Sequence, residues 1–258
     1  VRRPVGIFLS VLNIECHTII FVHTSAQPSS QSPENIRGTT PPAPRRAAGA
    51  TPPTTGRRAR AKAEKRARIL RSARSLISEK GYAQMSMSEV AARADVAAGT
   101  VFQYAATKAE LLMMVTESLW AEHITTVVAT PLAPGRQSPA AVVERIVELL
   151  SPFFKMSLHW PETTAWIARE ILFGEELPHR AEVLALVEKL EEHIARVLGG
   201  CLDEVSPRHV AHLEVGARMI VTSSLAELNR VRQGRTEERT LTDRIRGAAT
   251  LVAAGVSH

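Results

Sequence analysis

Three polar residues in the stretch 86–108 carry side chains that suit hydrogen bonding to a nucleic acid. The Thr100 hydroxyl can bond a phosphate or a base edge, and the Gln103 amide can pair with adenine through two hydrogen bonds. Ser86 precedes a predicted helix, so its hydroxyl and the free backbone N–H groups beside it can bind a phosphate. This chemistry is reversible recognition, and it requires elements that present the three side chains together.

The same stretch has the pattern of two short helices joined by a tight turn. Ser86 and Glu89 have the spacing of a capping box, which begins a helix. Residues 95–96 mark the turn, and residues 97–104 form a second helix of about two turns. This is the spacing of a helix-turn-helix, in which the second helix lies in the DNA major groove.

A strongly basic segment precedes the helix-turn-helix. Residues 57–74 contain nine Lys or Arg side chains and one acidic side chain, Glu64. Apolar residues recur at three- and four-residue steps from Ile69 to Ile77, which predicts an amphipathic helix with a basic outer face that ends at Gly81. A charged run can simply be a solvated helix face. Here the single sign of the charge and the adjacent helix-turn-helix favour contacts with DNA phosphates.

Residues 68–112 as a whole resemble the DNA-binding domain of TetR-type transcriptional regulators. In that family a helix ending in G-Y/F is followed by T/S-hydrophobic-x-x-I/V-A and then by A-G-V-S-x-G-T-L-Y-x-H/Y-F-x-S/N-K-x-x-L. This chain has I-L-R-S-A-R-S-L-I-S-E-K-G-Y, then M-S-M-S-E-V-A, then A-D-V-A-A-G-T-V-F-Q-Y-A-A-T-K-A-E-L-L. The resemblance implies that Tyr104 touches a phosphate and that Lys108 clamps one. The predicted DNA contacts are therefore Arg57, Arg58, Ser86, Ala97, Gly99, Thr100, Gln103, Tyr104 and Lys108.

Three positions in the recognition helix call for separate expectations. Phe102 matches the family aromatic that packs into the small core, so we expect it to be buried. Ala105 stands where the family usually has a Phe that anchors the end of this helix. Losing a buried Phe costs about 3–5 kcal/mol unless a neighbour such as Met113 or Met114 fills the gap. Ala97 stands where Ser is frequent, which removes one polar contact or cap.

The rest of the chain shows helical patterns and no strand pattern. Apolar periodicity and proline or Ser-Pro starts predict six further helices, over 107–129, from 139 with a possible end or kink at Pro152, from 161, and over 178–198, 207–232 and 237–254. With three helices in the head, the fold class is all-α, with a nine-helix TetR-like architecture. The predicted domains are a tail at 1–56, a DNA-binding domain at 57–106 and an effector-binding and dimerisation domain at 107–258.

Large aromatic residues recur in the predicted middle helices, where the family holds an apolar pocket for a small-molecule effector. Such residues can equally be ordinary core, and a neighbouring Arg and Glu can be polar anchors or a surface ion pair. The predicted pocket residues are Trp120, Phe154, Trp166, Arg169 and Glu170.

The last two predicted helices are the candidate dimer surface. A helix-turn-helix protein usually reads two half-sites, so it needs a two-fold partner. Small residues on these helices allow close packing, although the same helices can instead be core of one protomer. The predicted interface residues are Leu213, Ala217, Ile220, Leu228, Ile245 and Ala248.

Residues 1–56 differ from the rest in composition. An apolar run at 5–22 follows two arginines and precedes small residues, and the segment after it is rich in Pro, Ser, Thr and Ala, which is typical of disorder. Three interpretations are open. The start codon is assigned too far upstream, the segment is a flexible basic arm, or it is a signal or anchor. The last is the least favoured, because export would separate the helix-turn-helix from DNA.

Composition and motifs argue against catalysis. The chain has 258 residues, 45% hydrophobic and 22% charged, which is ordinary for a globular protein, and its net charge of +6 suits an anionic partner. Its two cysteines form no disulfide framework, and a reducing cytoplasm fits them. His209 and His212 have no acidic third ligand, and the chain has neither G-x-S-x-G nor a phosphate-binding glycine loop. We expect no enzyme activity, no cofactor and no metal.

These features predict a cytoplasmic, ligand-responsive transcriptional regulator without membrane contact. We expect a repressor that binds double-stranded DNA at a palindromic operator as a homodimer and responds to a small-molecule effector. The alternative is a helical interaction protein that keeps the fold but has lost sequence-specific DNA reading, for which Ala97 and Ala105 are the reasons.

Overall fold

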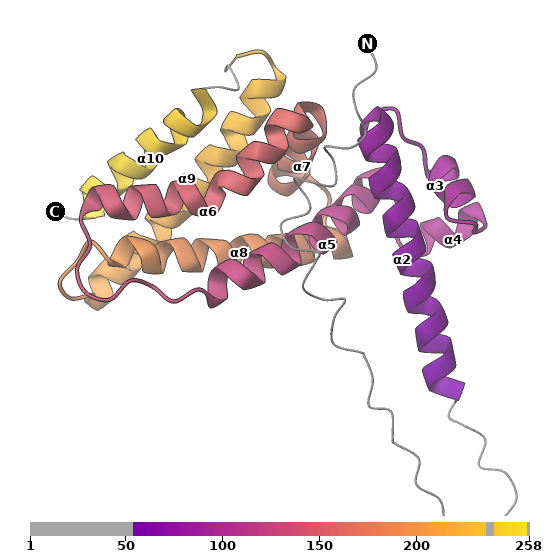
Figure 1. Ribbon diagram of the computed structural model, residues 1–258, viewed down its shortest axis with the longest axis horizontal. Coiled ribbons are helices and arrows are strands. Elements are labelled where there is room, and N and C mark those ends of the chain that lie inside the picture. Colours follow the sequence, from indigo (N-terminus) through magenta and orange to yellow (C-terminus); the bar gives the residue numbers. More distant parts are fainter. Residues whose placement is uncertain (1–53, 236–239, 257–258) are drawn as a thin grey trace, which may run out of the picture. The chain divides into compact units, whose positions relative to one another are not determined.

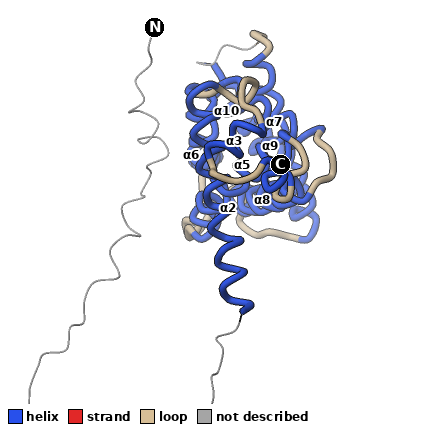
Figure 2. Tube along the Cα trace, turned by 90° about the vertical axis from the view of Figure 1, so that its right-hand side faces the viewer, coloured by secondary structure: helices blue, strands red, loops and turns tan. Residues whose placement is uncertain are grey.

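The computed structural model describes residues 54–235 and 240–256, and its regular elements there are all helices (Figures 1 and 2). The nine helices confirm the predicted all-α architecture. They are α2 (Thr54–Lys80), α3 (Met87–Arg93), α4 (Ala98–Phe102), α5 (Lys108–Ala129), α6 (Pro139–His159), α7 (Pro161–Phe173), α8 (Pro178–Gly199), α9 (Pro207–Arg232) and α10 (Leu241–Val256).

Two compact units divide the chain between Ala61 and Lys62. The first unit contributes only the opening turns of α2 to the described residues, and the second contains everything from Lys62 onward. Residues 1–53 of the predicted disordered tail lie outside the described residues, as does the predicted start of the last helix near residue 237. The last three residues of the predicted tail, 54–56, instead begin α2. The predicted division into domains 1–56, 57–106 and 107–258 stays a proposal.

Most helix ends follow from the local signals in the sequence. Gly81 has a φ of 82° and donates its N–H to the Ile77 carbonyl at 2.9 Å, which ends α2 as a left-handed cap. Ser138 caps α6 ahead of a proline in the first turn, and Ser206 does the same for α9. Pro152 does not end α6, which continues to His159.

Helices α5 to α10, here called the body, share one apolar core, and α2 to α4 are called the head. Helix α5 packs against α8, α9 touches α7, α8 and α10, and α10 also packs against α6 (Figure 1). Side chains from several of these helices are fully buried, among them Ile124, Ile146, Ile194 and Ile220. The head joins this body through α5, whose first residues pack with the helix-turn-helix and whose remainder packs with α8.

Gly216 permits the close packing of α9 on α10. A Cβ at this buried position would lie 2.6 Å from Cγ1 of Val252, too close for any unstrained contact. Gly216→Ala is therefore expected to lower the free energy of unfolding by about 1–2 kcal/mol, because overpacking outweighs the roughly 1 kcal/mol gained in helix propensity. Val252→Ala in the same chain should restore stability.

Gly247 provides the matched control for this prediction, measured by chemical denaturation. It lies in α10, it is exposed, and a Cβ there meets no atom within 4 Å. Gly247→Ala should raise the free energy of unfolding by about 0.5–1 kcal/mol. Equal effects at Gly216 and Gly247 would contradict the steric explanation.

Candidate DNA-binding surface and ligand cavity

Helix α4 presents a short exposed face in the head. Ala97 is its N-cap and makes no side-chain capping bond, and Gln103 is its C-cap. Ala97, Gly99 and Gln103 are exposed, while Thr100 is half-buried. A Cβ at Gly99 would meet no atom within 4 Å, so the face above it is open. Four of the predicted DNA-contacting residues thus lie on or next to one small helix.

Phe102 corrects one expectation, because half of its side chain, 51%, is exposed. The positions that point into the core are Val101 and Ala105, which lie four residues apart and are 0% and 1% exposed. Phe102 lies next to this buried stripe and so faces away from it. The resemblance predicts a buried aromatic at this position, but Phe102 lies on the accessible surface of α4. Phe102 therefore joins the candidate DNA contacts.

Ala105 is buried where a larger residue was expected from the resemblance. It is part of the same core as Met113 and Met114, which are 1% and 0% exposed. The end of α4 is also held by polar contacts. The backbone N–H of Ala105 donates to the Val101 carbonyl at 3.0 Å, and that of Ala106 donates to Glu110 at 2.6 Å.

Ser86 forms the predicted capping box of α3. Its hydroxyl accepts from the Glu89 N–H at 3.3 Å and donates to the Glu89 carboxylate at 2.8 Å, and the Ser86 N–H donates to the same carboxylate at 2.9 Å. Lys80 also donates to Glu89. In this conformation the Ser86 hydroxyl donates within the chain, so it must rotate to donate to a phosphate.

The capping box persists over a wide pH range. Hydrogen bonds from Lys80 and then from Ser86 lower the pKa of Glu89 to about 2 from a usual 4.5. A lowered carboxyl pKa adds stability above pH 4.5, and this contribution is lost as the pH falls toward about 2. The Glu89 carboxylate therefore keeps its charge and its hydrogen bonds at the start of α3 at neutral pH.

Tyr104 and Lys108 both make contacts within the head. The Tyr104 hydroxyl donates to the Lys62 carbonyl of α2 at 3.0 Å. The Lys108 ammonium donates to the Ala83 carbonyl at 2.8 Å and lies 4.6 Å from the centre of the Tyr82 ring. Partial burial lowers the pKa of Lys108, although Glu162 nearby opposes this shift. Since an ammonium has three donors, Lys108 keeps hydrogens for an additional acceptor.

The basic helix α2 divides into residues that pair within the chain and residues that do not. Arg66 donates to both Glu117 oxygens at 3.2 Å, Arg68 lies 3.7 Å from Asp95, and Arg74 donates to Ser118. These three arginines thus contribute to holding the head. The remaining basic side chains of the run are exposed, namely Arg57, Arg58, Arg60, Lys62, Lys65 and Arg71.

His179, in the first turn of α8, joins the body to the end of the recognition helix. Its Nε2 lies 3.0 Å from the Tyr104 carbonyl oxygen, and its Nδ1 lies 2.8 Å from Oε2 of Glu117. Both partners are hydrogen-bond acceptors, so the His179 ring lies between a backbone carbonyl of the head and a carboxylate of α5. No spacing in the sequence indicates this contact, which depends on the packing of α8 beside α5.

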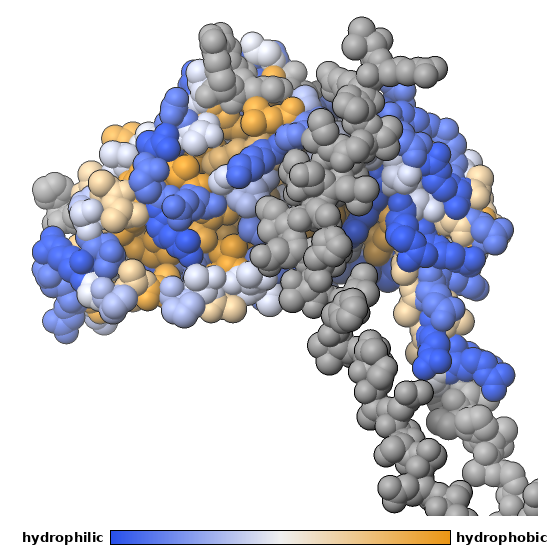
Figure 3. All heavy atoms as spheres, in the orientation of Figure 1, coloured by the Kyte–Doolittle hydropathy of each residue, from blue (hydrophilic) through white to orange (hydrophobic). Residues whose placement is uncertain are grey.

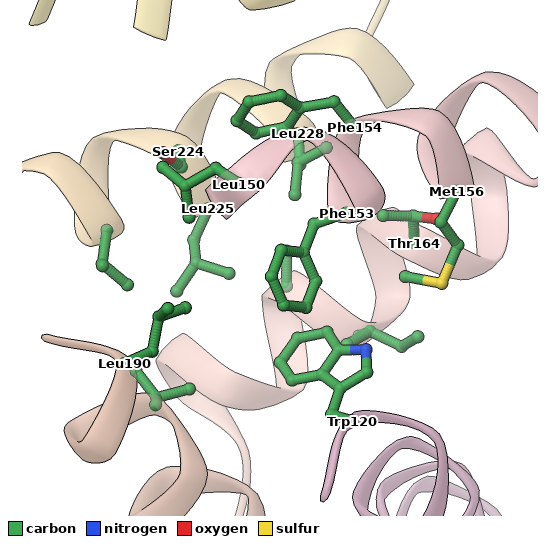
Figure 4. Close-up of a pocket in the computed structure, with 14 residues that line it drawn as sticks. Trp120, Leu150, Phe153, Phe154, Met156, Thr164, Leu190, Ser224, Leu225 and Leu228 are labelled. Atoms are coloured by element: carbon green, nitrogen blue, oxygen red, sulfur yellow. The ribbon is translucent and has the colours of Figure 1, made fainter. Parts of the chain in front are cut away.

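An apolar cavity lies in the body among α5, α6, α7, α8 and α9 (Figure 4). Its volume is about 40 Å³. Thr164 and Ser224 provide the hydroxyl groups in a wall that is otherwise hydrocarbon, aromatic ring or thioether. The Trp120 and Phe153 rings meet edge to face in this wall, with centroids 4.8 Å apart. The lining is Trp120, Leu150, Phe153, Phe154, Met156, Thr164, Ile167, Ala168, Val187, Leu190, Val221, Ser224, Leu225 and Leu228.

The five predicted pocket residues do not form one site. Trp120 and Phe154 line the apolar cavity. Arg169 and Glu170 line a separate cavity of about 310 Å³ between the start of α5, the end of α7 and the start of α8. Trp166 lines neither of these cavities. Its ring centroid lies 5.6 Å from that of Tyr82 in the head and 5.1 Å from Cζ of Arg169.

Helix α7 touches both the apolar cavity and the head. Thr164, Ile167 and Ala168 line the cavity. Two other residues of α7 contact the head. The Trp166 ring packs on that of Tyr82, and the Thr163 hydroxyl accepts a hydrogen bond from the Tyr82 N–H at 3.4 Å. Any displacement of α7 by a molecule in the cavity must therefore disturb contacts with the segment that connects α2 to α3.

The predicted dimer residues on α9 and α10 need correction. Five of the six lie in the core of a single chain, with exposures of 0–6%, and the sixth, Ala248, is half-buried. Both helices have two apolar sides, and the prediction selected the side that faces the protomer's own core. Other apolar residues on α9 and α10 are exposed, namely Val210, Val215, Met219 and Leu251 at 44%, 55%, 57% and 76%.

The surface of the body carries hydrophobic areas between hydrophilic ones, as Figure 3 shows for one face. Among the described residues, none of the helices is long and apolar enough to cross a membrane. In the same described residues, no three His, Cys, Asp or Glu side chains lie together where they could hold a metal ion.

Comparisons with known proteins agree with the motif. Residues 69–114 match the family described as "Bacterial regulatory proteins, tetR family". The HTH-type transcriptional repressor KstR of Rhodococcus jostii (strain RHA1) is 28% identical over 147 residues, which cover 57% of this chain and 64% of that repressor. The chain thus spans less than two thirds of its relative's length.

Solved structures share the fold at low identity. A TetR transcriptional regulator from Rhodococcus sp. RHA1 is 20% identical with a TM-score of 0.55, over 77% of this chain and 98% of that one. The repressor FadR of Thermus thermophilus, solved with lauroyl-CoA, is 21% identical with a TM-score of 0.52, over 72% of this chain and 92% of that one. Residues 69–114 therefore match the DNA-binding part of TetR-family regulators, and the chain shares the all-helical fold of the solved TetR-type structures.

Proposed function

We propose that this chain is a repressor that binds a two-fold operator as a homodimer and releases it when an effector with a long apolar tail enters the body. The observation that carries the proposal is the apolar cavity whose wall includes α7, because α7 also packs on the head.

DNA reading is assigned to the exposed face of α4. Gln103 can pair with adenine, and the exposed ring of Phe102 can contact a thymine methyl group in the major groove. Lys108 and the exposed basic residues of α2 supply contacts to phosphates, which position the helix without reading sequence. The backbone at Gly99 is open to close approach by the duplex.

Dimerisation is assigned to the outer sides of α9 and α10. Val215 and Met219 lie four residues apart on α9 and are both exposed, and Leu251 on α10 is the most exposed of the three. Exposed apolar residues on two helices that pack on each other support a self-complementary contact, as two-fold symmetry requires.

The effector is assigned to the apolar cavity. Its volume of about 40 Å³ is far below the roughly 300–1,000 Å³ of a small-molecule site, so a ligand must displace its walls to enter. An acyl chain matches the lining, and the lauroyl-CoA bound by the Thermus thermophilus repressor is an example of this chemistry.

Release then follows from differential binding. A ligand shifts an equilibrium only if it binds one conformation better than the other. An acyl chain binds only the conformation in which α7 has moved outward, and this movement disturbs the Trp166–Tyr82 contact. In a dimer, a small change in the spacing of the two recognition helices prevents both from entering the major groove together.

The experiment is a gel shift with the DNA upstream of the chain's own gene, at two salt concentrations. We expect a discrete dimer complex that Gln103→Ala and Lys108→Met weaken about tenfold each and that lauroyl-CoA dissociates. Lys155→Ala, at an exposed position of α6, is the control and should leave affinity unchanged. Binding that is uniform across sequences and indifferent to these changes would instead support the interaction-protein alternative.

Gly99→Ala separates DNA contact from stability. Gly99 has no positive φ and its Cβ position is empty, so alanine fits the free protein. We expect a gain in unfolding free energy of up to about 1 kcal/mol from helix propensity. DNA affinity should fall about tenfold nevertheless, because the added methyl keeps the duplex from the backbone. Fluorescence anisotropy measures the affinity, and an unchanged value would remove Gly99 from the DNA contacts.

A further inference from the structure

The Thr164 hydroxyl is a buried polar group in the wall of the effector cavity that lacks a partner. Thr164 is 2% exposed, its Oγ1 makes no hydrogen bond, and it lines the cavity. A buried hydroxyl without a partner is unfavourable, because it loses its bonds to water and gains none. Figure 4 shows it in the wall beside Met156, on the α7 side of the cavity.

Other buried hydroxyls in the body behave differently. Thr116 donates to the Leu112 carbonyl at 2.9 Å, Ser157 to the Phe154 carbonyl at 2.7 Å and Ser224 to the Ile220 carbonyl at 2.8 Å. Each bonds the preceding turn of its own helix. Ser224 shares the cavity with Thr164, yet its hydrogen is already used. Of the two hydroxyls in the cavity wall, the unpaired donor is therefore that of Thr164.

We infer that Thr164 donates a hydrogen bond to a carbonyl oxygen on the apolar effector. A carbonyl is a neutral acceptor that an acyl chain can carry into an apolar cavity without bringing a charge. A bare hydrocarbon would leave the hydroxyl unpaired, and a ligand with a second donor would add another unpaired group. The cavity thus selects an ester or thioester of a long chain over an ether or thioether of equal length. This inference rests on the proposed effector site.

The test uses the full chain and two ligands that differ at one position. Lauroyl-CoA has a thioester carbonyl, and S-dodecyl-CoA has a methylene in its place. Isothermal titration should show that the natural chain binds lauroyl-CoA about 5–10-fold more tightly. Thr164→Val has nearly the same shape without the hydroxyl, and it should bind both ligands equally. Thr164→Ser keeps the hydroxyl and should keep the preference.

Thermal unfolding of the ligand-free chain provides a second readout. Because the hydroxyl has no partner, Thr164→Val should raise Tm by about 2–4 °C. A fall in Tm would mean that the hydroxyl is bonded within the protein, and it would overturn the inference. The inference is equally overturned if Thr164→Val still prefers lauroyl-CoA.

The two levels of the proposal fail in different ways. If both ligands bind the natural chain equally and both dissociate the DNA complex, the role of Thr164 is wrong and the proposed function stands. If neither ligand binds or changes DNA affinity, both the carbonyl assignment and the acyl effector are wrong.

Discussion

Aspartate at both Met219 and Leu251 is expected to lower operator affinity by about 100-fold or more, the largest effect of any surface change in this chain. These side chains are 57% and 76% exposed on α9 and α10, so the change leaves the protomer core intact. Two charges at the centre of an apolar contact oppose association, and a single head then binds one half-site without the second. Sedimentation velocity should show monomers.

The control for this prediction is Leu132→Asp, which alters an exposed leucine in the segment between α5 and α6. It should leave both the dimer and the DNA affinity unchanged. If the Met219 and Leu251 double variant still sediments as a dimer, the outer sides of α9 and α10 are not the interface.

His179→Leu is expected to weaken DNA binding about tenfold and to lower the free energy of unfolding by about 2–3 kcal/mol. The substitution removes the donors to the Tyr104 carbonyl and to Glu117 at once. The end of α4 then loses its only contact with α8 among the described hydrogen bonds, and binding must order it again. The dimer should remain, because the substitution changes none of the exposed apolar residues assigned to the interface.

His159→Leu is the matched control, since His159 is exposed at the end of α6, where it hydrogen-bonds the Lys155 carbonyl and its ring lies beside that of Trp160. Anisotropy with operator DNA and urea denaturation give the two values. Equal loss of affinity in both variants would mean that His179 has no special role at the recognition helix.

The local features of this fold were predictable because their causes are local. Capping boxes, proline starts and the left-handed glycine each act within one turn, so Ser86, Ser138 and Gly81 could be assigned from spacing alone. The helix-turn-helix motif has the same character, since its order and spacing are fixed within a few tens of residues.

The misplaced residues depend on packing between distant segments. Phe102 lies one position from the buried stripe, and a rotation of 100° per residue is enough to bring it to the surface. Ile220 and Ile245 are apolar and helical, as an interface residue would be, but a pattern in one chain does not distinguish a neighbour in the same protomer from one in a partner. The contact of His179 with Tyr104 joins residues 75 positions apart.

The close approach of α9 and α10 at Gly216 has a mechanical consequence for a dimer built on their outer sides. Two helices packed this closely at a glycine are expected to resist sliding past each other, so the pair moves as a rigid unit. Such a rigid pair does not deform when the effector displaces α7. We therefore expect the movement of α7 to reach the head through the Trp166–Tyr82 contact and not to be taken up at the dimer interface.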